Sequence, residues 1–219
     1  MKLPSPRKKP SFAFSLIELL VVMVIIGILA ATLIPVLSKA KSVSKQSACL
    51  SNMRQLAIAF HLYTGDHDYD LPGRVNVPGQ DKWPKLLYEY TKTTKVFSAP
   101  GIEDSTGESL DLLSNATDNT SFIMNGYNDL GAYGNPDFHI KIISIPSPAQ
   151  TILLGMPKAH DTNFYMDYNE NNHTTILNLE AYGLGSNYVF ADGSARFIKE
   201  ADYQPIMWAV DKNYTVPGQ

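Results

Sequence analysis

Cysteine is almost absent from this sequence, and positive charge is scarce outside its first residues. Cys49 is the only cysteine among 219 residues, so no intrachain disulfide can form and the fold must depend on packing or on a metal. Four of the 18 basic residues lie in residues 1–13, and the remaining chain holds 14 basic and 21 acidic residues. Because nucleic-acid binding requires a basic face, this balance argues against it.

The short motifs of common enzyme classes are also absent. The sequence contains no Gly-x-Ser-x-Gly elbow, no glycine-rich phosphate loop and no Cys-x-x-Cys pair. His160, Asp161 and His173 share one polar segment, but two histidines thirteen residues apart in a loop specify no site. We therefore predict that the protein is not an enzyme.

What the sequence does contain is one apolar run of membrane length, from Phe14 to Leu37. A helix of these residues is about 36 Å long, and the hydrocarbon core of a bilayer is about 30 Å thick. Glu18 is the only ionisable side chain in the run. A charged side chain costs about 2.5–3.5 kcal/mol at the centre of such a segment and less near the interface, so intramembrane carboxylates usually have partners. We expect the partner of Glu18 to lie outside the chain.

The segment FAFSLIELLVVMVIIGILAATLIP, which follows four basic residues, resembles the processing site of type IV prepilins and type II secretion pseudopilins. The resemblance implies that a prepilin peptidase cuts between Ala13 and Phe14, and that the new amine of Phe14 is N-methylated. It places Glu18 where the family has its glutamate, and Pro35 where the family commonly has a helix-loosening proline. The family usually has glycine before the cut, so Ala13 is a departure.

The same resemblance implies an assembly role for Glu18. In a helical filament, the carboxylate of one subunit approaches the Phe14 amine of its neighbour, and this pair fixes the axial stagger of the subunits. An ordinary signal peptide is disfavoured, because the apolar run exceeds the usual length of about 7–15 residues and no small-x-small cleavage site follows it. A plain signal anchor, in which Glu18 lies at the interface without a partner, is the alternative.

Beyond the apolar run the pattern remains helical and becomes amphipathic. We predict one helix from Phe14 to about Tyr63, loosened near Pro35, with one apolar stripe that is buried against a soluble domain. On the opposite face, Ile58 and Leu62 are either scattered surface residues or contacts to other subunits. The stripe consists of residues at alternating spacings of four and three: Cys49, Met53, Leu56, Phe60 and Tyr63.

The chain after Pro72 is rich in Gly, Pro, Asn and Asp and contains short apolar runs, which predicts short strands and ordered loops. An Asp-Gly turn at Asp192–Gly193 predicts a hairpin. The predicted fold class is α+β, with a long N-terminal helix packed on a small antiparallel sheet. The expected elements are strands in residues 139–148, 150–157 and 186–200, a short helix in residues 83–92, and loops in residues 100–120 and 160–185.

The resemblance extends to a large bacterial group of pilin-like proteins, through CLSNMRQLAIAFHLYTGDHDYDLP, VFSAPG and NYVFADGSARFI. This group has a C-terminal signature of His, nine residues and Asp-Gly. Here Tyr182 stands at the His position, before Asp192 and Gly193. Ala99 stands where relatives often have cysteine, so if that cysteine pairs with one at the Cys49 position, this protein has lost the bridge.

A metal site is a minor alternative. Asp66, Asp68 and Asp70 occupy alternate positions, as at the start of a calcium loop, but the glycine at the sixth place and the closing glutamate are absent. Aspartate after a helix more often shapes a turn. We otherwise expect no cofactor.

We predict four segments. Residues 1–13 form a basic leader that is cleaved, residues 14–37 a transmembrane and filament-core helix, and residues 38–64 its amphipathic continuation. Residues 65–219 form a globular, extracytoplasmic α+β domain.

The expected function is that of a structural subunit in a type IV pilus-like filament or a type II secretion pseudopilus. The resemblance implies other copies and minor pilins as partners, together with a prepilin peptidase, an inner-membrane assembly platform with its ATPase, and membrane lipid before assembly. The protein would cross the inner membrane once and then enter a periplasmic or extracellular filament. The alternative is a membrane-anchored extracytoplasmic binding protein that holds a glycan or other polymer and never polymerises.

Overall fold

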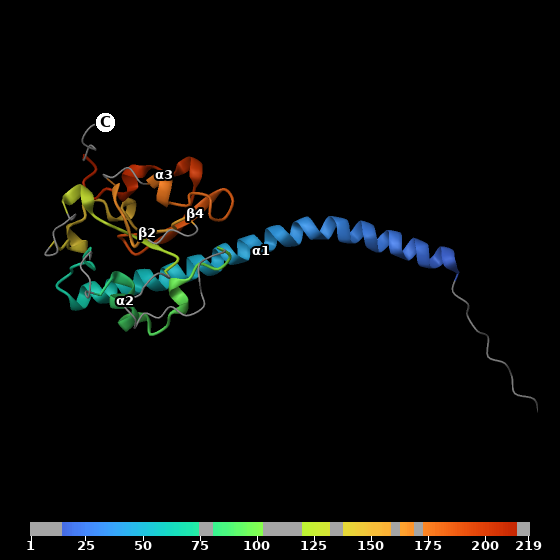
Figure 1. The fold of residues 1–219 in the computed structure, drawn as a ribbon, viewed down its shortest axis with the longest axis horizontal. Coiled ribbons are helices and arrows are strands. Elements are labelled where there is room, and N and C mark those ends of the chain that lie inside the picture. The colour runs from blue at the N-terminus through green and yellow to red at the C-terminus, as the bar shows by residue number, and fades with distance from the viewer. Residues whose placement is uncertain are drawn as a thin grey trace, which may run out of the picture. The chain divides into compact units, whose positions relative to one another are not determined.

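The computed structural model describes residues 15–74, 81–102, 120–131, 138–158, 163–168 and 173–213 (Figure 1). The chain divides into two compact units, residues 1–41 and residues 42–219. Helix α1 (Leu16–Asp66) begins in the first unit and ends in the second. The predicted long N-terminal helix is therefore confirmed, and it extends three residues beyond the expected end at Tyr63.

In the first unit, the structure describes Ser15 and the start of α1. Every described residue from Ser15 to Lys41 is exposed. Pro35 lies inside the helix. Because proline has no N–H, the carbonyl of Ala31 lacks its usual helical donor, which is the loosening that the sequence predicts.

The second unit contains a five-stranded sheet in the order β3-β1-β2-β4-β5. The pairs β1–β2, β2–β4 and β4–β5 are antiparallel, whereas β1 and β3 are parallel, so the sheet is mixed rather than antiparallel as predicted. Strand β2 runs in the direction opposite to β1, and β3 runs in the same direction as β1. Because β3 pairs with the edge of β1 that faces away from β2, the pair β1–β3 is parallel. The strands are β1 (Ile123–Asn125), β2 (Ile152–Gly155), β3 (Tyr165–Met166), β4 (Gly185–Phe190) and β5 (Ala195–Lys199).

Several predicted elements are confirmed, and others are wrong. Residues 150–157 contain β2, residues 186–200 contain the β4–β5 hairpin, and residues 83–92 contain helix α2 (Trp83–Thr91). The predicted strand in residues 139–148 is instead built around a 3₁₀ turn, because its buried isoleucines follow a spacing of two and three rather than strict alternation. Helix α3 (His173–Ile176) lies within the predicted loop of residues 160–185.

The remaining short helices are 3₁₀ turns. They are η1 (Lys95–Phe97), η2 (Asn128–Leu130), η3 (Ile142–Ser144), η4 (Pro148–Gln150), η6 (Glu200–Asp202) and η7 (Pro205–Trp208).

The core lies on both faces of the sheet. Strand β4 shows the alternation directly, since Val189 packs in the cluster that contains α1, whereas Tyr188 and Phe190 pack in a second cluster around Trp208. The predicted stripe of α1, from Cys49 to Tyr63, is buried in the first cluster, as predicted.

Helix α2 packs against that same stripe. The ring of Trp83 stacks on Phe60 with 6.1 Å between centroids, and its indole N–H donates to the carbonyl of Phe164 at 3.2 Å. Ile58 and Leu62, on the other side of α1, are 60% and 51% exposed. The second part of α1 is therefore amphipathic in the structure as well as in the sequence.

Candidate functional site

The start of α1 holds Glu18 in a local capping arrangement. The backbone N–H of Ser15 donates to Glu18 Oε2 at 2.9 Å, and the backbone N–H of Ile17 donates to Ser15 Oγ at 3.4 Å. This is the reciprocal pattern of a capping box, in which a serine and a glutamate three residues later satisfy the free N–H groups of a helix start. Glu18 remains exposed. The predicted cleavage residues Ala13 and Phe14 lie outside the described residues.

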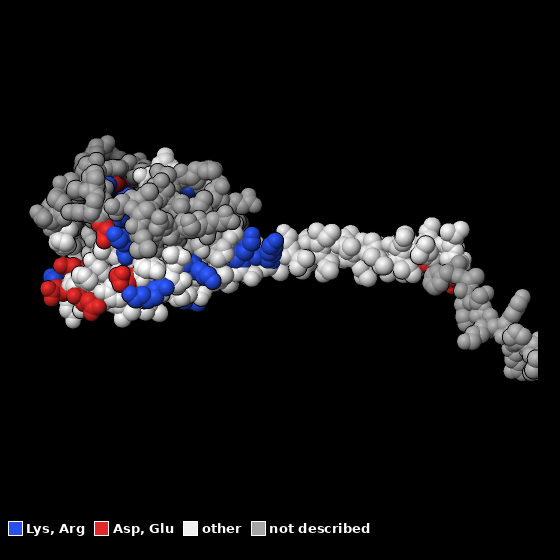
Figure 2. Space-filling view, turned by 60° about the horizontal axis from the view of Figure 1, so that its bottom comes forward, with Lys and Arg blue, Asp and Glu red and all other residues white. Residues whose placement is uncertain are grey.

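The apolar part of α1 is unpaired within the described chain. Its large hydrophobic side chains from Leu16 to Leu37 are all exposed, by 46–87%. By length and composition α1 contains one stretch that can cross a membrane, and none of that stretch is buried. Figure 2 shows this part of the helix as an almost entirely uncharged surface.

The C-terminal signature residues contact α1 at two places, and Tyr182 makes the first contact. Its hydroxyl donates to the carbonyl of Pro100 at 3.2 Å and lies beside the Cys49 thiol. Burial raises the pKa of Tyr182, and so does the neighbouring thiol. Burial likewise raises the pKa of Cys49, although hydrogen bonds from Tyr182 and Asn187 oppose that shift. Asn187 also donates to the carbonyl of Gln46 at 3.1 Å, which attaches β4 to α1.

The Asp192–Gly193 turn makes the second contact. The Asp192 carboxylate accepts hydrogen bonds from the backbone N–H and the hydroxyl of Ser194, at 2.9 and 2.6 Å. Burial alone would raise the pKa of Asp192, but these hydrogen bonds and the charge of Arg196 hold it below its ordinary value. Gly193 has φ +83°, and a Cβ built on it would lie 2.6 Å from Nε2 of His61. Only glycine fits here without a shift, because the backbone is left-handed and the turn rests on the helix.

The two ends of the signature therefore hold the β4–β5 hairpin against α1, at Cys49 and at His61. Ala99, the other departure from the family pattern, is buried in the same cluster as Cys49. Asn52, one turn after Cys49, donates to the carbonyl of Ser98 at 3.0 Å. The segments of Cys49 and Ala99 are therefore joined by polar contacts in this protein.

Residues 8–34 match the family model of the prokaryotic N-terminal methylation motif. This match supports a type IV prepilin-like protein. No curated protein and no solved structure matches it. The match covers the predicted cleavage site, Glu18 and most of the apolar run, and it supports a pilin-type or pseudopilin-type substrate of prepilin peptidase. The motif and the apolar helix together indicate a membrane-anchored, pilin-type protein, and families with this motif are structural rather than catalytic.

The candidate calcium residues of this prepilin-like protein are used in other contacts. Asp66 accepts a hydrogen bond from the hydroxyl of Tyr90 at 3.0 Å, and Asp70 pairs with the ammonium of Lys141 at 3.3 Å. Asp68 adopts a left-handed conformation, φ 51°, where α1 ends. Within the part of the chain that the structure describes, no group of three or more His, Cys, Asp or Glu side chains is arranged to hold a metal ion. Asp66 and Asp70 thus connect the end of α1 to Tyr90 and Lys141.

Only part of the histidine segment lies within the described residues. His160 and Asp161 lie outside the described residues. His173 is at the start of α3, and burial lowers its pKa.

Two contacts were not anticipated from the sequence. The first is the capping box, whose signal, Ser-x-x-Glu before an apolar run, is present at Ser15 and Glu18 and can be found by motif. The second is the contact between Gly193 and His61. The Asp-Gly pair predicts the turn, but no local pattern predicts which helical residue the turn meets.

Proposed function

We propose that the protein is a structural subunit of a type IV pilus-like filament or of a type II secretion pseudopilus. The observation that supports this most directly is the exposed apolar surface of α1 from Leu16 to Leu37, within and directly after the matched motif. A helix that is apolar on all sides needs apolar neighbours on all sides. Lipid supplies them before assembly, and the helices of other copies supply them in a filament.

The proposed route begins with a single span of the inner membrane. The basic leader, residues 1–13, lies on the cytoplasmic side by the positive-inside rule. Residues 14–37 cross the membrane, residues 38–64 continue the helix, and residues 65–219 form the domain outside the cytoplasm. A prepilin peptidase removes the leader, and an inner-membrane platform with its ATPase adds the subunit to other copies and minor pilins.

Glu18 sets the stagger of the subunits in this proposal. Cleavage creates a cationic amine at Phe14, and two unit charges about 4 Å apart attract by about 4 kcal/mol at an effective dielectric constant of about 20. Desolvation offsets much of this attraction. The larger effect is on specificity, because an unpaired carboxylate in an apolar bundle disfavours every incorrect stagger. The bond from Ser15 occupies Glu18 Oε2, and the carboxylate has a second oxygen for the neighbour.

Substitutions at Glu18 separate the charge from the helix cap. Glutamine also serves in a capping box, so Glu18→Gln keeps the cap and removes the charge. We expect normal membrane insertion and cleavage, with the yield of sheared filaments reduced about tenfold or more, since a loss of about 1.4 kcal/mol is a factor of ten. Glu18→Asp keeps the charge with a shorter reach, and its yield should fall between the two. Ser15→Ala disturbs the cap and keeps the charge, and it should resemble the parent.

Two outcomes would count against the proposal. A normal filament yield from Glu18→Gln would mean that the carboxylate has no assembly role. Processed protein that stays in the membrane of the parent strain, with no filaments under any condition, would favour the membrane-anchored binding protein instead.

A further inference from the structure

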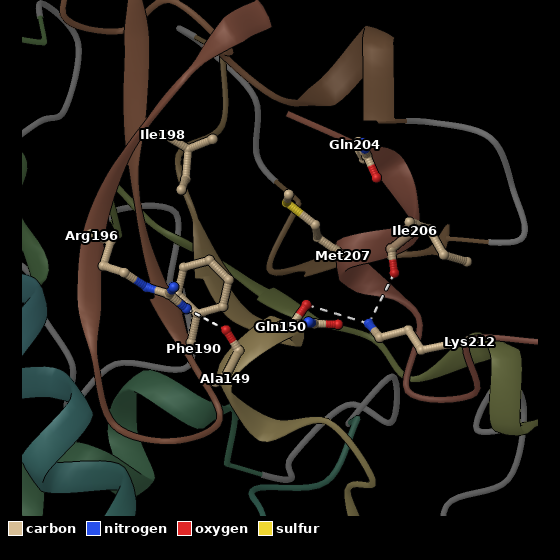
Figure 3. A pocket seen from close by; sticks show the side chains of 9 residues that line it. All are labelled: Ala149, Gln150, Phe190, Arg196, Ile198, Gln204, Ile206, Met207 and Lys212. Carbon is tan, nitrogen blue, oxygen red and sulfur yellow. Dashed lines mark hydrogen bonds between the residues drawn. The ribbon is translucent and has the colours of Figure 1, made fainter. Parts of the chain in front are cut away.

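A cavity of about 310 Å³ lies on the face of the sheet opposite α1, between the β4–β5 hairpin, η4 and η7 (Figure 3). Two cations, Arg196 and Lys212, line it, and among the residues that the structure describes no acidic side chain does. The other lining residues are apolar, except Gln150 and Gln204, whose side chains carry amide groups. None of its lining residues belongs to α1.

Arg196 is held in a fixed orientation. Its guanidinium carbon lies 3.6 Å from the centroid of the Phe190 ring, and Nη2 donates to the carbonyl of Ala149 (Figure 3). The stack covers Phe190, which is only 2% exposed, while Arg196 itself is exposed. A guanidinium has five N–H donors in a planar fork that suits a carboxylate. With one edge attached to the protein, this guanidinium can offer the others without losing further conformational freedom.

Lys212 contributes a fixed charge rather than hydrogen bonds. Its ammonium donates to the carbonyls of Gln150, Ile206 and Ala209 at 3.3, 3.0 and 2.5 Å, so all three of its donors are used. Burial lowers its pKa, and the nearby Asp129 carboxylate opposes that shift. The lysine therefore favours an anion in the cavity without being able to contact it as a donor.

Two carboxylates near these cations accept hydrogen bonds from other groups. Asp192 accepts two hydrogen bonds from Ser194, and Oδ2 of Asp129 accepts the backbone N–H groups of Val210 and Asp211 at 2.6 and 2.9 Å, while the buried Oδ1 of Asp129 has no hydrogen-bond partner among the described residues. Neither carboxylate lines the cavity. The two carboxylates reduce the positive potential in the cavity. The guanidinium of Arg196 is nevertheless the charged group that can donate hydrogen bonds to a ligand there.

We propose that this cavity binds one uronic acid unit, such as a residue of an acidic polysaccharide. The ligand's carboxylate would meet Arg196, the C–H face of the sugar would lie on Ile198 and Met207, and its hydroxyls would reach the amides of Gln150 and Gln204. A volume of about 310 Å³ lies at the lower end of the range of ligand pockets, about 300–1,000 Å³, which suits a small ligand such as one sugar ring. A simple anion such as phosphate would leave the apolar wall unused, and a neutral sugar would leave the cations unused.

Binding is measured on purified full-length protein in detergent micelles, so that the result does not depend on filament formation. The probes are sodium glucuronate, D-glucose as the neutral sugar of the same size, and N-acetylleucine as a mimic of a peptide chain end. We expect saturation-transfer NMR and titration calorimetry to show glucuronate binding at least about tenfold tighter than glucose, because a charge-assisted hydrogen bond is lost with the carboxylate. Binding should weaken as salt is added.

Variants assign the binding to the cavity. Arg196→Gln should weaken glucuronate binding at least about tenfold, whereas Arg54→Gln, at an exposed arginine of α1, should leave it unchanged. Gln204→Ala removes an exposed amide that lines the cavity and leaves the stacking of Arg196 on Phe190 intact. It should weaken glucuronate binding about threefold. Unchanged thermal unfolding confirms that each variant is folded. The proposal is overturned if glucuronate does not bind, if glucose or N-acetylleucine binds as tightly, or if neither Arg196→Gln nor Gln204→Ala weakens the binding.

Discussion

The two parts of helix α1 carry large apolar side chains, but only one part buries them within the chain. From Leu16 to Leu37 every such side chain is exposed, whereas from Cys49 to Tyr63 one stripe is buried in the domain core. The difference lies in the pattern. In the second part apolar residues occupy one face and polar residues the others, so a single domain can cover them. In the first part apolar residues occupy all faces of the helix, so a single domain packed on one side cannot cover them. We infer that the first part is reserved for lipid and for other copies.

The largest effect is expected when the second part of α1 is removed. A fragment that begins near Ser38 should fold and melt cooperatively as a monomer, whereas one that begins at Gly65 should be unfolded or aggregate. Each large side chain of the stripe contributes about 1.5–3 kcal/mol when buried, and a whole domain is stable by about 5–15 kcal/mol. Circular dichroism and analytical ultracentrifugation of the two fragments measure this. A cooperatively melting fragment from Gly65 would show that the stripe serves subunit contacts.

A matched pair of single substitutions sharpens the same comparison. Phe60→Ala should destabilise the domain by about 3–5 kcal/mol, because it leaves a cavity beneath the Trp83 ring. Ile25→Ala, which removes a large side chain from the exposed part of α1, should leave the domain's unfolding unchanged within about 0.5 kcal/mol. Denaturant unfolding of both full-length variants in detergent checks this. Equal losses of stability from the two variants would contradict the division of α1 into two functions.

A smaller loss is expected where the hairpin rests on the helix. Gly193→Ala and Gly183→Ala both place a side chain on a left-handed backbone, at a cost of about 1–2 kcal/mol, but only Gly193 has a neighbour within 4 Å, His61. We expect Gly193→Ala to be the more destabilising by about 1–3 kcal/mol, as for an overpacked site. Adding His61→Ala should recover that excess. If the two glycine variants unfold alike, the contact between the turn and α1 has no energetic role.

The smallest effect concerns Tyr182 and depends on pH. Its pKa is raised in the folded protein, so its contribution to stability is present below the ordinary tyrosine pKa of about 10 and is lost as the pH rises above it. Tyr182→Phe removes the bond to Pro100 and should cost about 0.5–1.5 kcal/mol at pH 7. The variant should also lose less stability than the parent between pH 9 and pH 11. Thermal unfolding across this range tests the prediction, and an unchanged alkaline slope would contradict it.

The structural features that depend on neighbouring residues could be predicted from the sequence. The features that depend on contacts between distant residues could not. The stripe of α1 follows a period of 3.6 residues, and the Asp192–Gly193 turn has a local signal, so both were predicted correctly. Strands β1 and β3 are only three and two residues long, and pairing with other strands rather than propensity defines them. The isoleucines of residues 139–148 have the composition of a strand, but they lie in a 3₁₀ turn.

The candidate functional residues show the same difference between local patterns and non-local contacts. The cleavage motif is a linear pattern, which explains why the sequence alone led to the family that the comparison supports. The cavity beside Arg196 combines residues from three separate segments, and no one of them carries a signal of its own. The contacts of Tyr182 with Pro100 and Cys49 are equally non-local. The resemblance marks Tyr182 as a departure from the expected histidine, but no local pattern predicts the contacts that Tyr182 makes.

The mature N-terminus tests the central claim most directly, because the proposed assembly role of α1 requires that the leader be removed first. Protein from native cells would be analysed by intact mass and N-terminal sequencing. We predict a chain that begins at Phe14, lacks the thirteen leader residues and carries one methyl group on its α-amine. A mature pool that retains Met1 would contradict the prepilin account. A start within residues 30–45 would contradict it as well and would indicate ordinary signal-peptidase cleavage.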